Sequence, residues 1–427
     1  MARKMKDSGI EWIGEIPEGW RTINPKALFT QRKDKAQKGE RQLTSSQQYG
    51  ILYQDDYMEL TGSKVVTVEK DFDILKHVEA GDFVISMRSF QGGLEYSTKS
   101  GAISSAYIML VPNLELVYPR FYKWLLKSSV YIDALQRTTN MVRDGQAMRY
   151  SNFAQVRLFT LPLDEQKSRA DFLDLECSSI DKILSKTRSS IEEYKKLKQA
   201  VITQAVTKGV RGEREMKDSG VEWIGAIPKD WEIKRLKSFC TIVDCKNRTP
   251  DVFPDGKYTV VRTTCIKDCS FSYEGSYQTD TTNFKAWTLK GQPHKGDIFF
   301  TREAPVGDAC LVPNADNLCM GQRVMFFRPE DNSDARYIMY SIYGPLVREY
   351  IASKNSGSTV GHLKLGQVAC IPIFYCPPLE QKEIADYLDA KCAEIAGLIA
   401  KKEQLVKELE NYKKSLIYEV VTGKREV

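Results

Sequence analysis

Five short stretches of the chain bring together side chains that could act on another molecule, and these are basic, amide and hydroxyl groups. They are residues 86–93 and 141–150 in the first half and residues 246–249, 301–303 and 353–364 in the second. Lys and Arg bind phosphates, and Arg, Gln, Asn, Ser and Thr can reach the edges of bases. The stretches therefore predict contact with double-stranded DNA, although a solvent-exposed loop can have the same composition. The candidate contact residues are Arg88, Gln91, Arg143, Gln146, Arg149, Tyr150, Lys246, Arg248, Arg302, Ser358, Thr359, His362 and Lys364.

The sequence holds no set of residues typical of an enzyme. Residues 376–379, Cys-Pro-Pro-Leu, lack the polar first residue and the aromatic last residue of an aminomethyltransferase signature, and no Gly-x4-Gly-Lys-(Ser/Thr) phosphate loop occurs. The histidines at 77, 294 and 362 are not accompanied by a Gly-x-Ser-x-Gly elbow. We therefore predict a chain that is not an enzyme and binds no cofactor of its own.

Two groupings of metal-ligating residue types are weaker candidates. Asp251 and Asp255 are four residues apart among Pro and Gly, whereas a two-carboxylate nuclease site needs ligands on rigid neighbouring elements. The cysteines that could gather on zinc are Cys240, Cys245, Cys265 and Cys269. Their spacing contains no Cys-x2-Cys pair, and reduced cysteines are common in protein cores. The prediction is that no metal is bound.

A 16-residue phrase occurs twice in the chain. Residues 5–20 read MKDSGIEWIGEIPEGW and residues 216–231 read MKDSGVEWIGAIPKDW, identical at 12 of 16 positions. A Gly-Asp pair and a Pro-Leu-(x)-Glu-Gln signal also recur in the same order, each 215 residues apart. A repeat of this length indicates a duplicated domain, because solenoid repeats are far shorter. We expect the phrase to be fixed by its large aromatic residues, which are Trp12, Trp20, Trp223 and Trp231.

A long amphipathic helix is predicted after each Pro-Leu-(x)-Glu-Gln signal, because acidic residues there suit the positive end of the helix dipole. Apolar residues then step by three and four, as in a coiled coil. The predicted seams are Ile180, Leu184, Thr187, Ile191, Tyr194, Lys198 and Val201, and Ile395, Leu398, Lys402, Leu405, Leu409, Tyr412 and Leu416. Each helix is the other's obvious partner in an antiparallel pair. The alternative is that each helix packs only on its own globular domain.

Short β-like runs lie between phrase and helix in each half, at residues 64–68, 83–86, 258–261 and 297–300. The two globular segments otherwise share almost no sequence. The predicted fold class is therefore α+β: two globular mixed α/β domains separated by two long antiparallel helices that form a coiled coil, with a pseudo-two-fold internal repeat.

Composition limits the class of protein further. A chain of 427 residues with 42% hydrophobic and 28% charged residues is typical of a globular protein of two or three domains. The net charge of +6 permits a nucleic-acid partner without requiring one. No apolar run approaches the roughly 18–20 residues of a membrane helix, and no signal-like segment follows Met1. These features predict a cytoplasmic protein with reduced thiols.

The order of the repeated landmarks resembles one family, the specificity subunits of Type I restriction-modification systems. The landmarks are the two Asp-Ser-Gly-(Ile/Val)-Glu-Trp-Ile-Gly-x-Ile-Pro-x-x-Trp phrases, the two Pro-Leu-(x)-Glu-Gln signals, and the Gly-Asp pairs before Arg88 and Arg302. Residues 421–426 also echo residues 206–215, which lead into the second phrase. The resemblance implies two target-recognition domains in a circular pseudo-dimer, in which the end of the chain meets its beginning.

The implied domain boundaries follow from the landmarks. They are 1–20 for the first repeat segment, 21–161 for the first target-recognition domain, 162–208 for the first long helix, 209–231 for the linker and second repeat segment, 232–377 for the second target-recognition domain, and 378–427 for the second long helix and tail.

The resemblance also implies the partners. They are double-stranded DNA with a bipartite, asymmetric target, two methyltransferase (M) subunits and restriction (R) subunits, and S-adenosylmethionine, ATP and magnesium would belong to these subunits. A helix of roughly 35–40 residues spans roughly 50–60 Å, so the half-sites would be separated by about one to two turns of DNA. Two alternatives stay open: a coiled-coil scaffold that binds protein, and a nuclease or DNA methyltransferase with an unrecognised site.

Overall fold

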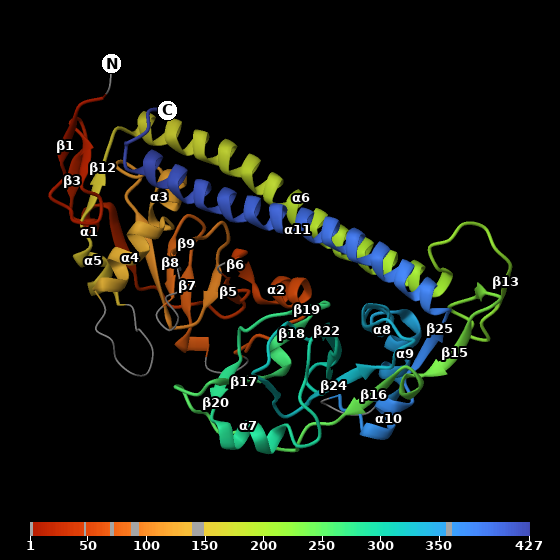
Figure 1. Cartoon of the computed structure of the whole chain (residues 1–427). Coiled ribbons are helices and arrows are strands. Elements are labelled where there is room, and N and C mark those ends of the chain that lie inside the picture. The colour runs from red at the N-terminus through yellow and green to blue at the C-terminus, as the bar shows by residue number, and fades with distance from the viewer. Residues whose placement is uncertain (1–2, 47, 69–71, 87–93, 139–148, 356–360) are drawn as a thin grey trace. The chain divides into compact units, whose positions relative to one another are not determined.

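The chain divides into two compact units. The computed structural model describes residues 3–46, 48–68, 72–86, 94–138, 149–355 and 361–427 (Figure 1). Unit 1 comprises residues 1–188 and 404–427, and unit 2 comprises residues 189–403. Each unit contains one globular domain and a segment of both long helices, α6 (Leu163–Lys208) and α11 (Pro378–Val421).

The domain of unit 1 is built on a four-stranded antiparallel sheet with the order β4-β11-β8-β9. Its strands are β4 (Phe29–Arg32), β8 (Phe83–Ser86), β9 (Leu94–Tyr96) and β11 (Tyr107–Pro112). Smaller antiparallel pairs are β5 (Leu43–Ser46) with β6 (Gly50–Tyr53), β7 (Lys76–Val78) with β10 (Gly101–Ile103), and β3 (Arg21–Ile23) with β12 (Leu158–Thr160). The helices are α1 (Pro25–Leu28), α2 (Gln54–Thr61), α3 (Pro119–Leu126), α4 (Ser129–Arg137) and α5 (Tyr150–Gln155). The core is rich in aromatic residues, with Phe29 edge-on to Phe83, Tyr122 and Phe153.

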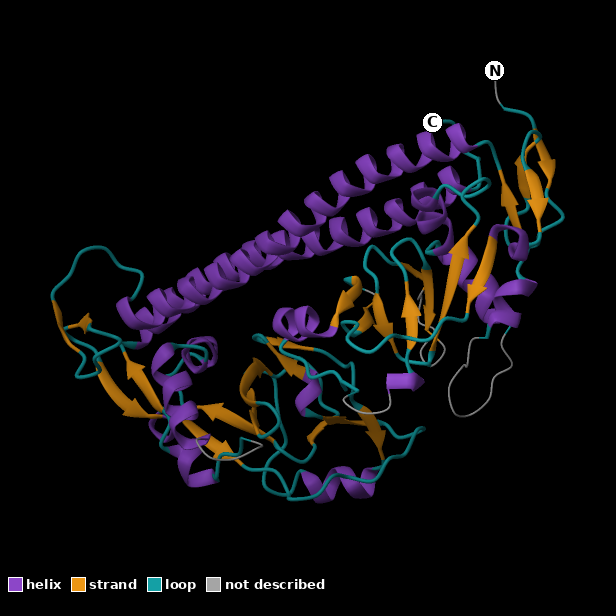
Figure 2. Ribbon diagram, turned by 180° about the vertical axis from the view of Figure 1, so that it is seen from behind, coloured by secondary structure: helices purple, strands orange, loops and turns teal. Residues whose placement is uncertain are grey.

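The domain of unit 2 repeats the four-stranded antiparallel sheet, with the order β16-β24-β21-β22. Figure 2 draws the strands of both units in orange. Its strands are β16 (Cys240–Val243), β21 (Ile298–Arg302), β22 (Val306–Leu311) and β24 (Val324–Pro329). A second, three-stranded sheet contains β17 (Tyr258–Val261), β20 (Tyr277–Thr279) and β23 (Leu318–Met320). Two further antiparallel pairs are β15 (Glu232–Arg235) with β25 (Pro372–Tyr375), and β18 (Ile266–Lys267) with β19 (Ser270–Phe271). The helices are α7 (Thr281–Trp287), α8 (Ala335–Ile342), α9 (Pro345–Asn355) and α10 (Leu365–Ala369).

Three of the four predicted strands are confirmed as β8, β17 and β21. The prediction of a strand at residues 64–68 is wrong, because this segment pairs with no strand. Its backbone groups bond instead to glutamine side chains: Val68 N donates to Gln42 Oε1 at 2.9 Å, and Val66 O accepts from Gln54 Nε2 at 3.4 Å. The β-branched composition alone therefore misled the prediction, since Val66 is 87% exposed.

Each repeated phrase forms a small hairpin. In unit 1, β1 (Met5–Asp7) pairs with β2 (Glu15–Pro17), and in unit 2, β13 (Met216–Asp218) pairs with β14 (Ala226–Pro228). The Asp carboxylate at the end of each first strand accepts a hydrogen bond from the Gly N–H two residues later, at 2.9 and 3.0 Å. The two copies of the phrase therefore form the same hairpin turn, which needs the same residues at the same positions.

Only the second tryptophan of each phrase is completely buried. Trp20 and Trp231 have no exposed surface, as predicted, and Trp12 is half-buried with its indole N–H donating to Arg157 O at 3.3 Å. The prediction is wrong for Trp223, which is 63% exposed. The first tryptophan of the phrase is therefore packed differently in the two units, because the globular domains beside the two hairpins differ.

In unit 1 the first hairpin and the end of α11 share one core. Trp20 stacks on Phe159 at 5.0 Å between ring centroids, and its indole N–H donates to Glu165 Oε2 at 3.1 Å. Arg169, only 1% exposed, donates to Val420 O at 2.8 Å, a carbonyl in the last turn of α11, and to Arg425 O at 2.9 Å in the tail beyond the helix. Figures 1 and 2 show the two ends of the chain beside each other. The predicted meeting of the two ends of the chain is confirmed.

Unit 2 reproduces the pairing between the helix start and the hairpin. Glu380, which is completely buried, pairs with Arg214 at 2.6 Å, and the Arg214 guanidinium lies 5.2 Å from the centre of the Trp231 ring. In unit 1 the matching Glu165 pairs with Arg3 at 2.5 Å, and the Arg3 guanidinium lies 5.6 Å from the centre of the Trp20 ring. Arg3 precedes the first phrase by two residues, as Arg214 precedes the second, and Glu165 pairs in addition with Arg169 one turn further along α6. Burial opposes ionisation of Glu165, but bonds from Arg3, Arg169 and Trp20 outweigh it and lower its pKa to about 2. The Glu of each Pro-Leu-(x)-Glu-Gln signal therefore ties the helix start to the hairpin.

The Gln of the same signal ties the helix start to the globular domain. Gln166 donates to Leu116 O and Leu161 O, and its carbonyl accepts from Tyr118 N at 2.7 Å. Gln381 in unit 2 makes the equivalent bonds to Cys376 O and from Asp334 N. Both side chains are completely buried, which explains why an amide is needed at this position.

The two long helices run antiparallel in each unit. In unit 1, Lys413 pairs with Asp181 at 2.6 Å and Arg188 pairs with Glu410 at 2.5 Å. In unit 2, Arg211, just beyond α6, pairs with Glu383 near the start of α11 at 2.7 Å. Ile180, Leu184, Leu416 and Val420 belong to the same core as the unit 1 domain. Each helix therefore packs both on its partner helix and on a globular domain.

The predicted seam of α6 is confirmed, but that of α11 contains an error. Leu405 and Tyr412 are 41% and 48% exposed, and the less exposed positions are Val406 and Lys413. Steps of three and four from Ile395 through 398, 402, 406, 409, 413, 416 and 420 describe the line of least exposed residues. Leu405 and Tyr412 also fit steps of three and four, so the pattern alone did not separate the two registers, and Lys413 takes its seam position through an ion pair with Asp181.

Candidate functional site

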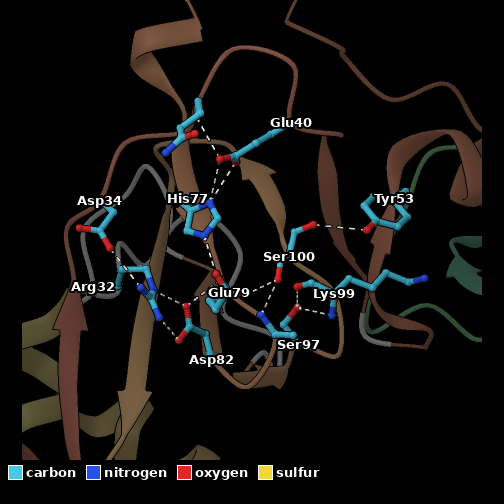
Figure 3. A network of polar contacts seen from close by, with 12 residues as sticks. Arg32, Asp34, Glu40, Tyr53, His77, Glu79, Asp82, Ser97, Lys99 and Ser100 are labelled. Carbon is cyan, nitrogen blue, oxygen red and sulfur yellow. Dashed lines mark hydrogen bonds and ion pairs between the residues drawn. The ribbon is translucent and has the colours of Figure 1, made fainter.

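A Gly-Asp turn fixes the start of an inner strand in unit 1. Asp82 is 2% exposed and accepts hydrogen bonds from Arg32 Nε at 2.6 Å and Nη2 at 3.0 Å, and from Glu79 N at 3.0 Å (Figure 3). Gly81 has φ of 106°, a conformation that glycine adopts without strain. The recurring Gly-Asp pair is therefore a structural feature that sets where β8 begins.

The turn in unit 2 is built in the same way. Asp297 is 3% exposed and accepts from Arg328 Nε at 3.0 Å and Nη2 at 2.7 Å, and from His294 N at 2.9 Å. The arginine comes from a different strand, β24, than its counterpart on β4 in unit 1. The strand that this turn begins, β21, ends at Arg302.

His77 extends the polar network of unit 1 (Figure 3). Its Nδ1 lies 3.0 Å from both Glu40 carboxylate oxygens and its Nε2 lies 3.0 Å from Glu79 Oε2. Burial disfavours the charged ring, but the two carboxylates outweigh burial and raise the pKa of His77. A doubly protonated ring satisfies both carboxylates, which only accept hydrogen bonds. The network holds β7 to the loop that contains Glu40.

Four of the six contact residues predicted in unit 1 lie outside the described residues: Arg88, Gln91, Arg143 and Gln146. Arg149 is exposed and precedes α5, and its backbone N–H donates to Asn152 Oδ1 at 3.0 Å. The hydroxyl of half-buried Tyr150 donates to Phe29 O at 3.2 Å, inside the domain.

The predicted contact residue Arg302 is buried in unit 2. It is 9% exposed, and its Nη1 donates to the two Asp244 carboxylate oxygens at 3.0 and 3.2 Å. Its Nη2 donates to Asn247 Oδ1 at 3.0 Å. The guanidinium therefore makes its strong bonds within the domain.

Arg302 is also where the three predicted stretches of unit 2 converge. Its backbone carbonyl accepts from Leu363 N at 3.0 Å, and Oε2 of the neighbouring Glu303 lies 3.3 Å from His362 Nδ1. Lys364 follows at the exposed start of α10. Ser358 and Thr359 lie outside the described residues. The structure thus brings together residues 246–249, 301–303 and 362–364, which are far apart in sequence.

Trp287 supports the basic residues of this surface. α7 begins at Asp280, whose carboxylate accepts from Asn283 N at 2.8 Å, and the helix ends at Trp287. Lys246 Nζ and the Arg248 guanidinium lie 4.7 and 5.2 Å from the centre of the Trp287 ring, within cation–π range. The indole N–H donates to Arg248 O at 3.1 Å.

Two strained backbone positions flank the same surface. Ala304 has φ of 49° and Arg323 has φ of 77°, values that residues other than glycine rarely adopt. Such residues cluster at functional sites, where the surrounding structure enforces them. Sequence reasoning missed Asp244, Trp287 and Arg323, and it placed Asn247 in a predicted stretch without naming it as a contact residue. Asp244 is a carboxylate, which DNA phosphates would repel, and Trp287 lies 39 residues from its partner Arg248, so no local signal identified either residue.

The weaker metal candidates are not assembled in the described part of the chain. Cys240 belongs to one core cluster and Cys245 and Cys265 to another, and burial raises the pKa of all three thiols. Asp251 and Asp255 are exposed. Among the described residues there is no group of three or more His, Cys, Asp or Glu side chains placed to hold a metal ion. Nor is any described helix long and apolar enough to cross a membrane.

Comparison with known proteins shows which family of proteins this chain is similar to. Residues 228–408 match the family model of the Type I restriction modification DNA specificity domain. The putative type I restriction enzyme MjaX specificity subunit of Methanocaldococcus jannaschii is 23% identical, over 96% of this chain and 95% of its own length. The MjaVIII specificity subunit of the same organism is 23% identical, over 81% of this chain and 80% of its own length. The chain is therefore similar to specificity subunits of Type I restriction-modification systems along most of its length and matches their DNA specificity domain over residues 228–408, in agreement with the resemblance of its repeated landmarks.

A solved structure supports the fold. One chain from a study of complex assembly and conformational transition of the type I R-M system covers 96% of this chain with 99% of its own length, at a TM-score of 0.68 and 15% identity. The predicted fold class, with two domains separated by two long antiparallel helices, is confirmed. The relatives are named as specificity subunits, which agrees with the prediction that the chain is not an enzyme.

Proposed function

We propose that this chain recognises a bipartite, asymmetric DNA sequence and positions methyltransferase and restriction subunits on it. The single observation that carries the proposal is the convergence of three basic segments of unit 2 around Arg302, within a domain matched by the DNA specificity model. Lys246, Arg248 and Lys364 supply charge for phosphates, and His362 supplies a group for base edges.

Two different half-sites are proposed because the units share their framework and not their domains. The hairpin, the buried tryptophan and the Glu-Gln pair recur in both units, whereas the sequences of the globular domains diverge. Different domain sequences would read different bases, so we expect an asymmetric target. The helices have 46 and 44 residues, about 69 and 66 Å, somewhat longer than the sequence predicted. We still expect the two half-sites to be separated by about one to two turns of DNA.

The proposed partners are two M subunits, docked along the long helices, and R subunits. Large apolar side chains that are 40% exposed or more lie on these helices, as expected of a surface that a partner covers. They are Leu163, Leu175, Ile183, Leu197, Leu379, Tyr387, Leu405 and Tyr412. S-adenosylmethionine, ATP and magnesium would be bound by the partners, and work on cellular DNA would place the complex in the cytoplasm.

Salt dependence tests DNA recognition directly. We expect full-length protein to bind duplex DNA with an affinity that falls as salt rises, because each phosphate contact releases counterions. Replacing both Lys246 and Arg248 by Gln should reduce the magnitude of the slope of log K against log salt by roughly 1 for each phosphate that is no longer neutralised. The measurement is fluorescence anisotropy with labelled duplexes from about 50 to 200 mM salt.

The matched control is Lys391→Gln, which removes an exposed lysine from α11 and should leave the slope unchanged. Binding that does not depend on salt, or a slope equal in the double variant and the control, would favour the scaffold alternative. Purified protein that cuts or methylates DNA without partners would favour the enzyme alternative.

A further inference from the structure

We infer that Arg302 is a positioning residue for DNA recognition: it holds the loop of residues 244–249 so that Lys246 and Arg248 face the target, and does not itself contact DNA. The sequence instead predicted direct contact. The inference rests on the proposed function and deepens it, because it distinguishes the residue that organises the surface from the residues that touch DNA.

The first argument is that the Arg302 guanidinium makes its hydrogen bonds within the domain. Its two terminal nitrogens bond to two different residues of the loop, Asp244 and Asn247, at 3.0 Å each. Arg302, at the end of β21, is 9% exposed, whereas Arg248, on the loop that Arg302 holds, is exposed. The planar fork of arginine can bridge two partners in a fixed geometry, and the ammonium of lysine cannot reproduce that geometry. The positive charge of Arg302 is already paired inside the domain.

The second argument is that the loop is held from several sides. Gln322 donates to Asn247 O at 3.2 Å, and Trp287 donates to Arg248 O at 3.1 Å. The Trp287 ring also lies against both Lys246 and Arg248. A loop with its backbone bonded at successive residues is preorganised, so less conformational freedom is lost when it binds.

The third argument is that Arg302 joins this loop to the other segments. Its backbone N–H donates to Arg323 O at 3.0 Å, and its carbonyl accepts from Leu363 N at 3.0 Å. Arg323 adopts φ of 77°, and Ala304, two residues after Arg302, adopts 49°. Strained conformations persist only when their surroundings enforce them. The end of β21 is therefore a rigid junction from which the basic side chains project.

The experiment selects binding sequences from a random duplex library with the full-length protein. The variants are Arg302→Lys, which keeps the charge and loses the planar fork, Asp244→Asn, which removes the negative charge of its half-buried partner, and the double variant. We expect each single variant to lose base preference at one half-site only and to bind the wild-type target about tenfold more weakly, the cost of one mismatched base pair. The half-site read by unit 1 is the internal control.

The double variant separates positioning from contact. If Arg302 acts through Asp244, the double variant should be no worse than the weaker single variant, because both changes break one interaction. If Arg302 contacts DNA directly, Asp244→Asn should leave binding intact or strengthen it while Arg302→Lys weakens it, and that result would overturn the inference. Asn247→Ala, at an exposed position, provides a further test if Arg302→Lys or Asp244→Asn fails to fold, and it should show the same loss at one half-site.

The inference and the proposed function can fail separately. Wild-type protein that enriches two half-sites, both unchanged in Arg302→Lys and Asn247→Ala, would overturn the inference alone. Wild-type protein that enriches no sequence would overturn the proposed function and the inference with it.

Discussion

Trp20→Ala is expected to destabilise unit 1 by about 3–5 kcal/mol, the usual cost of truncating a fully buried tryptophan. The indole has no exposed surface, stacks on Phe159 and donates a hydrogen bond to Glu165. The end of α11 shares this core, and a Cβ added at Gly423 would lie 2.9 Å from the Trp20 ring. The truncation should therefore also release the last turn of α11. Urea unfolding followed by circular dichroism, with hydrogen exchange over residues 416–423, measures both effects.

Matched tryptophans give the controls for this prediction. Trp231→Ala should destabilise unit 2 by a similar amount and leave exchange at residues 416–423 unchanged, because it lies in the core of the other unit. Trp223→Ala, at a residue 63% exposed, should change the free energy of unfolding by less than about 0.5 kcal/mol. If Trp20→Ala behaved like Trp223→Ala, the joining of the first hairpin to the end of α11 would not contribute to stability.

Replacing residues 232–377 by the corresponding domain of another specificity subunit is expected to change one half-site of the DNA target completely and leave the other unchanged. The physical reason is that the contacts that support this domain at its ends belong to the repeated framework. Gln381 bonds to Cys376 O and Asp334 N, and Glu380 pairs with Arg214 outside the exchanged segment. The measurement is the sequence selected from a random duplex library by the chimaeric protein.

The reciprocal exchange of residues 21–161 is the control for the chimaera. It should change only the half-site that the first chimaera retains. A chimaera in which both half-sites change would contradict the assignment of one half-site to each domain. A folded chimaera with neither half-site changed would place the base contacts outside the exchanged residues.

The framework could be predicted from the sequence because its residues make the same contacts twice. Gln166 and Gln381 are buried and bonded in the same way. In the Gly-Asp turns at 81–82 and 296–297, the Asp carboxylate accepts from the backbone N–H three residues earlier. Such contacts need the same residue types at the same spacing, so they leave a repeat. The meeting of the two ends of the chain followed from the same repeat.

The rest depended on contacts that a linear pattern does not contain. The exposure of Trp223 differs from the burial of Trp20 and Trp231 because different domains lie beside the hairpins. The seam of α11 was misplaced because the pattern alone did not separate two registers, and Lys413 takes its seam position through its ion pair with Asp181. Burial of Arg302 could not be predicted either, since its partners Asp244 and Asn247 precede it by 58 and 55 residues. Most of the candidate site in unit 1 lies outside the described residues and stays a prediction.

The most direct test of the central claim is a map of methylated adenines across the genome of cells that carry this gene with a partner methyltransferase, compared with cells from which this gene alone is deleted. We predict that one bipartite, asymmetric motif is methylated in the first cells and unmethylated in the second. An unchanged methylation pattern, with the partner subunit shown to be expressed, would contradict the specificity role and favour the scaffold alternative.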